Sequence, residues 1–218
     1  MDRQPEATTR PIIEYYFSFI SLWSYVGSLA FFDLVRRYDA EVIFKPIDLL
    51  AIFAAGGGKP VKERPPQRQA YRLVEMQRWR DLRGIPLVLH PRYYPADPSL
   101  AHRMLLVAIA RKDDVAAFVH AGLKAVWADE LDITDPDTLV DLANQSGLDG
   151  AQMLAAAGNG DLVDAEAALT REATNRQLFG APFYFYRDEP FWGQDRLDHL
   201  ALAIETQRPP IHSPSTLD

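Results

Sequence analysis

Apolar residues dominate the chain from residue 12 to 19, where isoleucine, tyrosine and phenylalanine follow one another. Aromatic and β-branched residues favour extended backbone, so this stretch predicts a buried strand. Apolar residues at helical spacing predict a helix at 23–38, and an alternating pattern predicts a second strand at 41–47. A strand, a helix and a strand with a short connection predict a parallel pair with a right-handed crossover.

The middle of the chain follows a helical pattern instead. Asp135 before Pro136 predicts a capped helix start, because proline suits the first helical position. Gly84 predicts a helix end, since glycine readily adopts the left-handed conformation common there. The helices predicted in this part of the chain are 66–83, 99–111, 115–127, 136–146, 151–157 and 161–179.

The strand pattern returns after Gly180. Residues 183–186 are all aromatic and 190–192 complete a hairpin, after which Gly193 opens a last helix at 194–205. Strand–helix–strand at one end and strand–strand–helix at the other is the order of a thioredoxin-like fold, here an α/β protein split by a large all-helical insertion. The predicted division is a discontinuous thioredoxin-like domain at 11–50 and 178–206, a helical insertion domain at 51–177, and flexible tails at 1–10 and 207–218.

Composition narrows the function classes. The net charge of -7 argues against nucleic acid as a partner, because phosphate binding needs an excess of lysine and arginine. No window reaches the roughly 18 apolar residues of a membrane span, and the first residues lack the apolar core of a signal peptide. We therefore expect a cytoplasmic protein. The histidines show no metal-ligand spacing, so no metal site is predicted.

The absence of cysteine decides what the first turn can do. A thioredoxin-type domain carries Cys-x-x-Cys between its first strand and helix, whereas this chain has Ser21-Leu22-Trp23-Ser24 and no cysteine anywhere. Any sulfur chemistry must therefore use a sulfur that arrives with a ligand. At a helix N-terminus, the Ser21 hydroxyl can donate to a bound thiolate and lower its pKa. The simpler interpretation is that Ser21 is an ordinary N-cap, and the two roles are compatible.

A second candidate is the Ala181–Pro182 bond, at the place where thioredoxin folds have a cis proline. Sequence alone favours a trans bond, because only about one X-Pro bond in twenty is cis. If the bond is cis, the backbone of Ala181 faces the ligand and can pair with a peptide as an added strand does. The alternative is a simple proline at the start of a strand.

A third candidate follows Gly193, which permits a tight approach. Gln194 and Asp195 would lie at a helix start, where free amides and polar side chains can hold both ends of an amino-acid zwitterion. The alternative is that Asp195 only complements the helix dipole. Lys59, in the glycine-rich loop at 56–59, is a possible partner for a ligand carboxylate.

Several motifs carry a family resemblance, from about residue 11 to about residue 206. They are Phe17-Ser18-Phe19-Ile20-Ser21-Leu22-Trp23-Ser24-Tyr25, Gln77-Arg78-Trp79, Gly84-Ile85-Pro86, Ala125-Val126-Trp127, Phe179-Gly180-Ala181-Pro182 and Phe191-Trp192-Gly193-Gln194-Asp195-Arg196-Leu197. In this order and spacing the chain resembles the 2-hydroxychromene-2-carboxylate isomerases. Those enzymes are related to the kappa-class glutathione transferases, within the DsbA-like group of thioredoxin folds.

The resemblance implies a glutathione-dependent isomerase of a small aromatic substrate, commonly a homodimer. Ser21 would position and activate the glutathione sulfur. Ala181, beside Pro182, would bind the cysteinyl backbone, and Gln194 and Asp195 would take the γ-glutamyl end. The thiolate adds reversibly to the conjugated side chain of the substrate, which turns a double bond into a rotatable single bond, and its expulsion gives the other isomer.

The chain also departs from the family pattern at the active turn. Ser18 stands where the family usually has aspartate, and Leu22 replaces a proline, which frees the first amide of the helix. Phe183 stands where threonine is usual and enlarges an apolar wall beside the sulfur. The expected substrate pocket consists of Trp23, Phe183 and Trp79.

Two other functions stay open at this point. One is a kappa-like glutathione transferase or peroxidase. The other is a non-catalytic thioredoxin-fold binding protein, an alternative that Ser18 and Leu22 favour. A disulfide oxidoreductase is excluded, because the chain has no cysteine.

Overall fold

The sheet is the centre of the structure, a computed structural model that describes residues 10–212. It has four strands in the order β2-β1-β3-β4. β1 pairs in parallel with β2 and antiparallel with β3, and β3 pairs antiparallel with β4. The strands are β1 (Ile12–Phe17), β2 (Glu41–Pro46), β3 (Phe183–Tyr186) and β4 (Glu189–Trp192). The predicted thioredoxin-like order and the parallel first pair are confirmed.

The helices also follow the predicted order. They are α1 (Leu22–Arg37), α2 (Leu49–Ala55), α3 (Pro66–Arg83), α4 (Ser99–Ala110), α5 (Ala116–Trp127), α6 (Pro136–Gln145), α7 (Gly150–Ala157), α8 (Gly160–Asn175) and α9 (Leu197–Thr206), with short 3₁₀ helices η1 (Val61–Glu63) and η2 (Gln194–Arg196). Asp135 caps α6 through the Thr138 amide, and Gly84 ends α3 in the left-handed conformation, as predicted.

Three parts of this outline differ from the sequence prediction. The pattern did not predict α2, which Asp48 caps through two backbone amides. α8 ends at Asn175 rather than at 179, because Gln177, just beyond its C-cap Arg176, adopts a positive φ of 59°. The last helix begins as η2 before it becomes α9. The predicted tails lie mostly outside the described residues, and the two-domain division stays a prediction.

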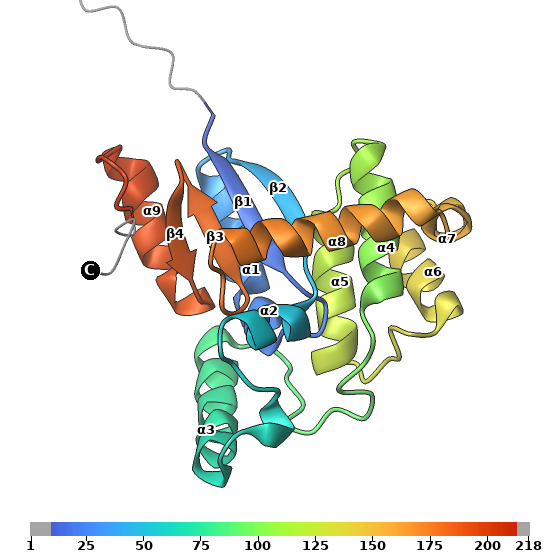
Figure 1. Ribbon diagram of the computed structural model, residues 1–218, viewed down its shortest axis with the longest axis horizontal. Coiled ribbons are helices and arrows are strands. Elements are labelled where there is room, and N and C mark those ends of the chain that lie inside the picture. The colour runs from blue at the N-terminus through green and yellow to red at the C-terminus, as the bar shows by residue number, and fades with distance from the viewer. Residues whose placement is uncertain (1–9, 213–218) are drawn as a thin grey trace, which may run out of the picture.

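Each face of the sheet carries its own layer (Figure 1). Tyr15 and Tyr184 stack with ring centroids 5.2 Å apart and contact Phe31 of α1. The neighbouring residues Tyr16 and Phe183 lie in a separate apolar cluster on the side of α2 and α8. The alternation of a strand therefore assigns adjacent aromatic residues to opposite layers.

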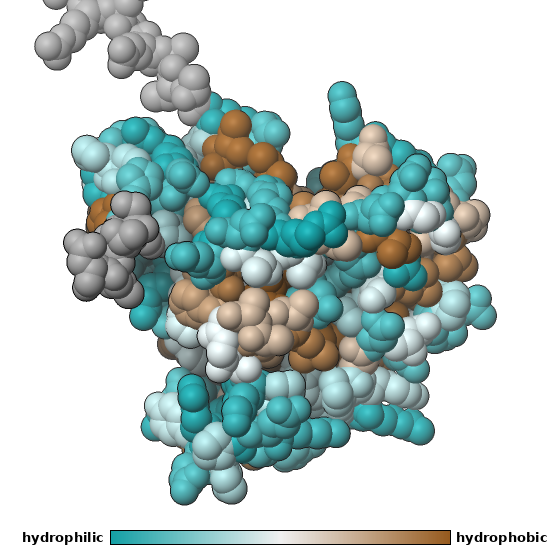
Figure 2. All heavy atoms as spheres, viewed as in Figure 1, coloured by the Kyte–Doolittle hydropathy of each residue, from teal (hydrophilic) through white to brown (hydrophobic). Residues whose placement is uncertain are grey.

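The surface over α8 and α3 is mainly hydrophilic, with a hydrophobic area between them where α2 lies (Figure 2). α3 projects from the rest of the molecule (Figure 1), and Met76 is its one fully buried side chain. Across residues 10–212, none of the helices has both the length and the apolarity that crossing a bilayer requires.

Candidate functional site

The turn between β1 and α1 is held by its own hydrogen bonds. The Ser21 amide donates to the Ser18 carbonyl at 2.8 Å. The Ser21 hydroxyl accepts from the Ser24 amide at 3.2 Å, which makes Ser21 the N-cap of α1. The capping interpretation is thus confirmed. Within the described chain the amides of Leu22 and Trp23 have no hydrogen-bond partner, so they are available to an anion at the helix start.

The same hydroxyl joins the turn to the segment before β3. Ser21 Oγ donates to the Ala181 carbonyl at 3.2 Å, across 160 positions of sequence. The Ala181–Pro182 bond is cis. Ser21 is only 3% exposed, so its proton points at the backbone and not at solvent. To donate to a ligand, the Ser21 hydroxyl must therefore rotate so that its proton points at the ligand atom instead of at the Ala181 carbonyl.

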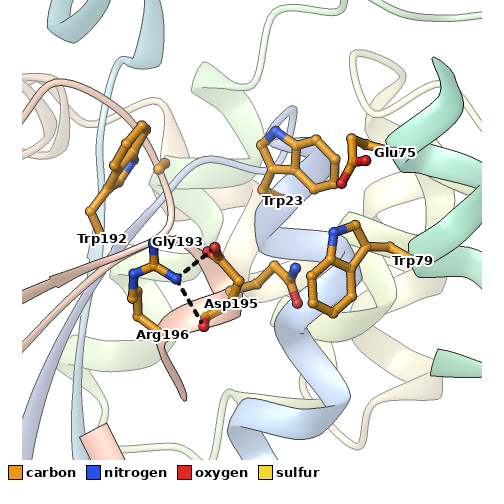
Figure 3. Close-up of a pocket in the computed structure, with 9 residues that line it drawn as sticks. Trp23, Glu75, Trp79, Trp192, Gly193, Asp195 and Arg196 are labelled. Carbon is orange, nitrogen blue, oxygen red and sulfur yellow. Dashed lines mark hydrogen bonds and ion pairs between the residues drawn. The ribbon is translucent and has the colours of Figure 1, made fainter. Parts of the chain in front are cut away.

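A cleft of about 220 Å³ opens beside this junction. It is lined by Trp23, Glu75, Trp79, Ala181, Trp192, Gly193, Gln194, Asp195 and Arg196. Trp23 and Trp79 form one side and Trp192 lies opposite, with the paired side chains of Asp195 and Arg196 between them (Figure 3). Asp195 Oδ2 is 2.8 Å from Arg196 Nη1, and both side chains are about half exposed, 45% and 49%.

Glycines allow the walls of this cleft to approach closely. A Cβ on Gly180 would lie 2.7 Å from Trp192 Nε1. Gly193 has a φ of +99°, which L side chains rarely adopt, and a Cβ there would lie 2.4 Å from Asp195 Oδ1. Gly193 therefore suits glycine through its backbone conformation, whereas a Cβ at Gly180 would require the Trp192 side chain to shift.

The sequence analysis missed the residue that holds Gln194. Arg83, from the end of α3, donates to Gln194 Oε1 at 2.9 Å, and its guanidinium lies 5.3 Å from the centroid of the Trp79 ring. Gln194 is 3% exposed. Because its oxygen is occupied, its amide nitrogen is the group that it can offer to a ligand. No local signal pairs residue 83 with residue 194, since only the fold brings them together.

Glu75 is a second residue of the cleft that was missed. It lies on α3, four positions before Trp79, and Arg78 donates to it at 2.6 Å. That hydrogen bond, with one from Tyr71, lowers the pKa of the Glu75 carboxyl. The cleft therefore presents an ionised carboxylate on α3 at neutral pH.

Two predicted site residues lie elsewhere in the described structure. Lys59 is exposed and does not line the cleft, and its carbonyl accepts a hydrogen bond from Arg64. Phe183 packs with Phe179 and Phe185 on the α8 side of the sheet, away from the Trp23 side chain. The expected pocket of Trp23, Trp79 and Phe183 is therefore corrected to the two tryptophans, because adjacent strand residues face opposite layers. No metal-binding cluster of histidine and carboxylate side chains occurs within residues 10–212.

Comparison with known proteins identifies relatives over most of the chain. The family model for the DSBA-like thioredoxin domain matches residues 12–205. A 2-hydroxychromene-2-carboxylate isomerase of Sphingobium xenophagum is 32% identical over 86% of this chain and 95% of that protein. The isomerase of the same name from Pseudomonas putida is 28% identical over 88% and 94%.

Solved structures give the same picture. A 2-hydroxychromene-2-carboxylate isomerase superposes with a TM-score of 0.74 at 26% identity, over 90% of this chain and 95% of that one. A probable DsbA oxidoreductase from Streptomyces coelicolor superposes with a TM-score of 0.72 at 20% identity, over 94% of each chain. The second match shows the fold alone.

Proposed function

This chain belongs to the DSBA-like thioredoxin domain family, and from that premise we propose that it is a glutathione-dependent isomerase of the 2-hydroxychromene-2-carboxylate type. The observation that carries the proposal is the position of Ser21, which caps α1 and meets the carbonyl before the cis Pro182. The sequence similarity to isomerases over most of the chain supports the reaction.

The groups around the cleft fit glutathione. Ala181 offers a backbone amide with no hydrogen-bond partner in the described chain, which suits the backbone of a bound peptide. Asp195 can accept the ammonium of the γ-glutamyl end, while the Gln194 amide and Arg196 can donate to its carboxylate. Glutathione, when bound, would supply the thiol that adds to the substrate and leaves again.

The protein side of the reaction follows from the helix start. The Ser21 hydroxyl would turn its proton from the Ala181 carbonyl to the ligand sulfur and stabilise the anion there. The free amides of Leu22 and Trp23 face the same end of the helix, where the helix dipole favours negative charge. The indoles of Trp23 and Trp79 supply an apolar wall for an aromatic ring.

The test combines binding and turnover. We expect millimolar glutathione to raise the melting temperature, because a ligand that binds only the folded state stabilises it. S-methylglutathione should raise it as well but support no isomerisation, because its sulfur is blocked. Interconversion of 2-hydroxychromene-2-carboxylate and its open-chain isomer, followed by absorbance, should require free glutathione.

Three results would contradict the proposal. No thermal shift with either peptide would indicate a protein that does not bind glutathione. A conjugate that accumulates with a model electrophile, without isomerisation, would indicate a transferase. Turnover with S-methylglutathione would exclude a role for the free thiol. The homodimer and the cytoplasmic location stay predictions, and light scattering of the purified protein tests the first.

A further inference from the structure

A chain of three polar side chains runs from the active turn into the helical insertion. Ser18 Oγ lies 3.2 Å from Nε2 of His102 on α4, and His102 Nδ1 lies 2.8 Å from Oε1 of Glu166 on α8. Ser18 and His102 are completely buried, and the Glu166 side chain is 13% exposed. None of the three lines the cleft beside Ser21.

The direction of these hydrogen bonds follows from the chemistry of the groups. An ionised carboxylate only accepts, so His102 Nδ1 donates to Glu166. In a neutral imidazole the other nitrogen then accepts, and the Ser18 hydroxyl donates to Nε2. Arg103 Nη1 lies 3.7 Å from Glu166 Oε2.

The order serine–histidine–carboxylate matches that of a hydrolase triad, but access excludes that use. No surface of Ser18 or His102 is exposed, so no substrate can reach the hydroxyl. The three hydrogen-bonded side chains can therefore act only on the conformation of the turn. Ser18 is also the residue whose carbonyl accepts the Ser21 amide, so fixing Ser18 fixes the residue that caps α1.

Packing supports this role, because the next residue, Phe19, is packed against α4 and α5 of the insertion. The Phe19 ring stacks on His102 at 5.7 Å and meets Phe118 of α5 edge to face at 5.8 Å. Gly122 of α5 makes room for it, since a Cβ there would lie 2.5 Å from the ring. The helical insertion therefore contacts the turn at two consecutive residues, Ser18 and Phe19.

We propose that His102 and Glu166 are positioning residues. Through Ser18 they hold Ser21 in the place from which its hydroxyl can donate to a bound ligand. Buried hydrogen-bonded side chains of this kind are not needed for stability, because apolar side chains of similar size often stabilise a fold as well or better. What the hydrogen bonds add is one defined arrangement of the three side chains, since each bond requires its own geometry. The effect on catalysis rests on the proposed function, whereas the effect on the turn does not.

The molecule provides a matched control. Ser28, within α1, is also completely buried, and its hydroxyl lies 2.8 Å from Nδ1 of His120 on α5. Ser18→Ala and Ser28→Ala therefore each remove one buried hydroxyl that contacts a histidine of the insertion. Only Ser18 belongs to the turn.

The experiment measures hydrogen exchange and kinetics on both variants. We expect Ser18→Ala to speed exchange of the Ser21 and Ser24 amides, the two that are hydrogen-bonded within the turn, at least tenfold. It should also lower kcat for the glutathione-dependent isomerisation about tenfold, with the KM for glutathione unchanged. Ser28→Ala should leave the exchange of these amides and kcat within twofold. Equal exchange in the two variants would overturn the proposal.

Substitutions of His102 provide the rescue. Glutamine offers an acceptor and a donor at nearly the same separation as the two ring nitrogens, whereas leucine offers neither. We expect His102→Gln to keep slow exchange of the Ser21 and Ser24 amides and His102→Leu to lose it. If both exchange alike, the hydrogen bonds do not position the turn. If the natural protein shows no glutathione-dependent activity, the proposed function fails, but the exchange measurement still decides this inference.

Discussion

Two polar clusters in this protein differ in how their groups are satisfied. The turn cluster, at the end of the sheet before α1, consists of Ser18, Ser21, His102 and the Ala181 carbonyl. The charge cluster, on the α8 side of the sheet, joins carboxylates of β1 and α8 to cations of β2 and the segment after α8. Its members are Glu14, Tyr16, Lys45, Glu172 and Arg176.

In the charge cluster every charge finds its partner internally. Lys45 Nζ lies 2.6 Å from Glu172 Oε1, and Arg176 Nη1 lies 2.8 Å from Glu14 Oε2. Burial alone would raise the pKa of each carboxyl. Lys45 and Arg176 lower the pKa of Glu14, and Lys45 with the Tyr16 hydroxyl lowers the pKa of Glu172. A network in which every charged group has a partner joins layers of the fold and offers no unpaired charge to a ligand.

The turn cluster lies beside backbone amides that are unsatisfied. It holds hydroxyl and backbone groups around Ser21, and the helix amides of Leu22 and Trp23 have no partner in the described structure. The comparison teaches that the number of polar groups does not mark a functional site. The informative feature is donors left unpaired at a place that a ligand can approach.

The largest effect is expected from removing the Ser21 hydroxyl of the turn cluster. Ser21→Ala should lower kcat for the glutathione-dependent isomerisation by about 100-fold or more, the usual cost of losing one donor to a developing anion. The lost cap should cost about 1 kcal/mol of the free energy of unfolding. Steady-state rates and urea unfolding measure both quantities. Unchanged activity would leave Ser21 as a cap alone.

The next largest effect is expected from a substitution that breaks the charge cluster. Lys45→Met should lower the free energy of unfolding by about 2 kcal/mol, because Glu14 and Glu172 lose a partner in a site that is partly screened by water. Activity should stay within twofold. Lys124→Met, which removes the exposed pair with Asp129, is the control and should cost no more than about 0.5 kcal/mol. Equal costs in the two variants would show that the cluster is only surface charge.

A smaller effect is expected at the rim of the cleft. Gly193→Ala should weaken glutathione binding about tenfold, because the new Cβ displaces Asp195 and strains a backbone of positive φ. Calorimetric titration measures the change. Gly158→Ala is the control, since a Cβ at Gly158 has nothing within 4 Å. Equal affinity in both variants would remove Asp195 from the binding site.

The smallest effect concerns pH. The folded pKa values of Glu14 and Glu172 lie below their ordinary values, so their contribution to stability is complete above the unfolded pKa of about 4.3. It is lost as the pH falls through the lower folded values. We expect the free energy of unfolding to decline below about pH 4, less steeply in Glu172→Gln. An identical decline in that variant would contradict the assignment.

Local chemistry let the sequence determine the order of the elements and the cap at Ser21. Strand alternation, helical spacing and capping depend on neighbours within a few residues, so β1, α1 and the start of α6 could be read from the chain. The resemblance also indicated Ala181, Gln194 and Asp195, and the structure brings all three to one cleft. Their roles with glutathione stay predictions.

Tertiary structure decided which distant groups meet. Only packing shows that Arg83 holds Gln194, that Ser18 reaches His102, and that the Ala181–Pro182 bond is cis. Alternation predicts that Phe183 and Tyr184 face opposite layers, but only the covering helices decide which layer lies at the cleft. Tertiary structure also sets the place of Lys59, outside the lining of the cleft, since a loop carries no periodicity that fixes where its side chain lies. Its role with glutathione stays a prediction. The chain thus encodes its elements locally, whereas the site arises from contacts between residues far apart in sequence.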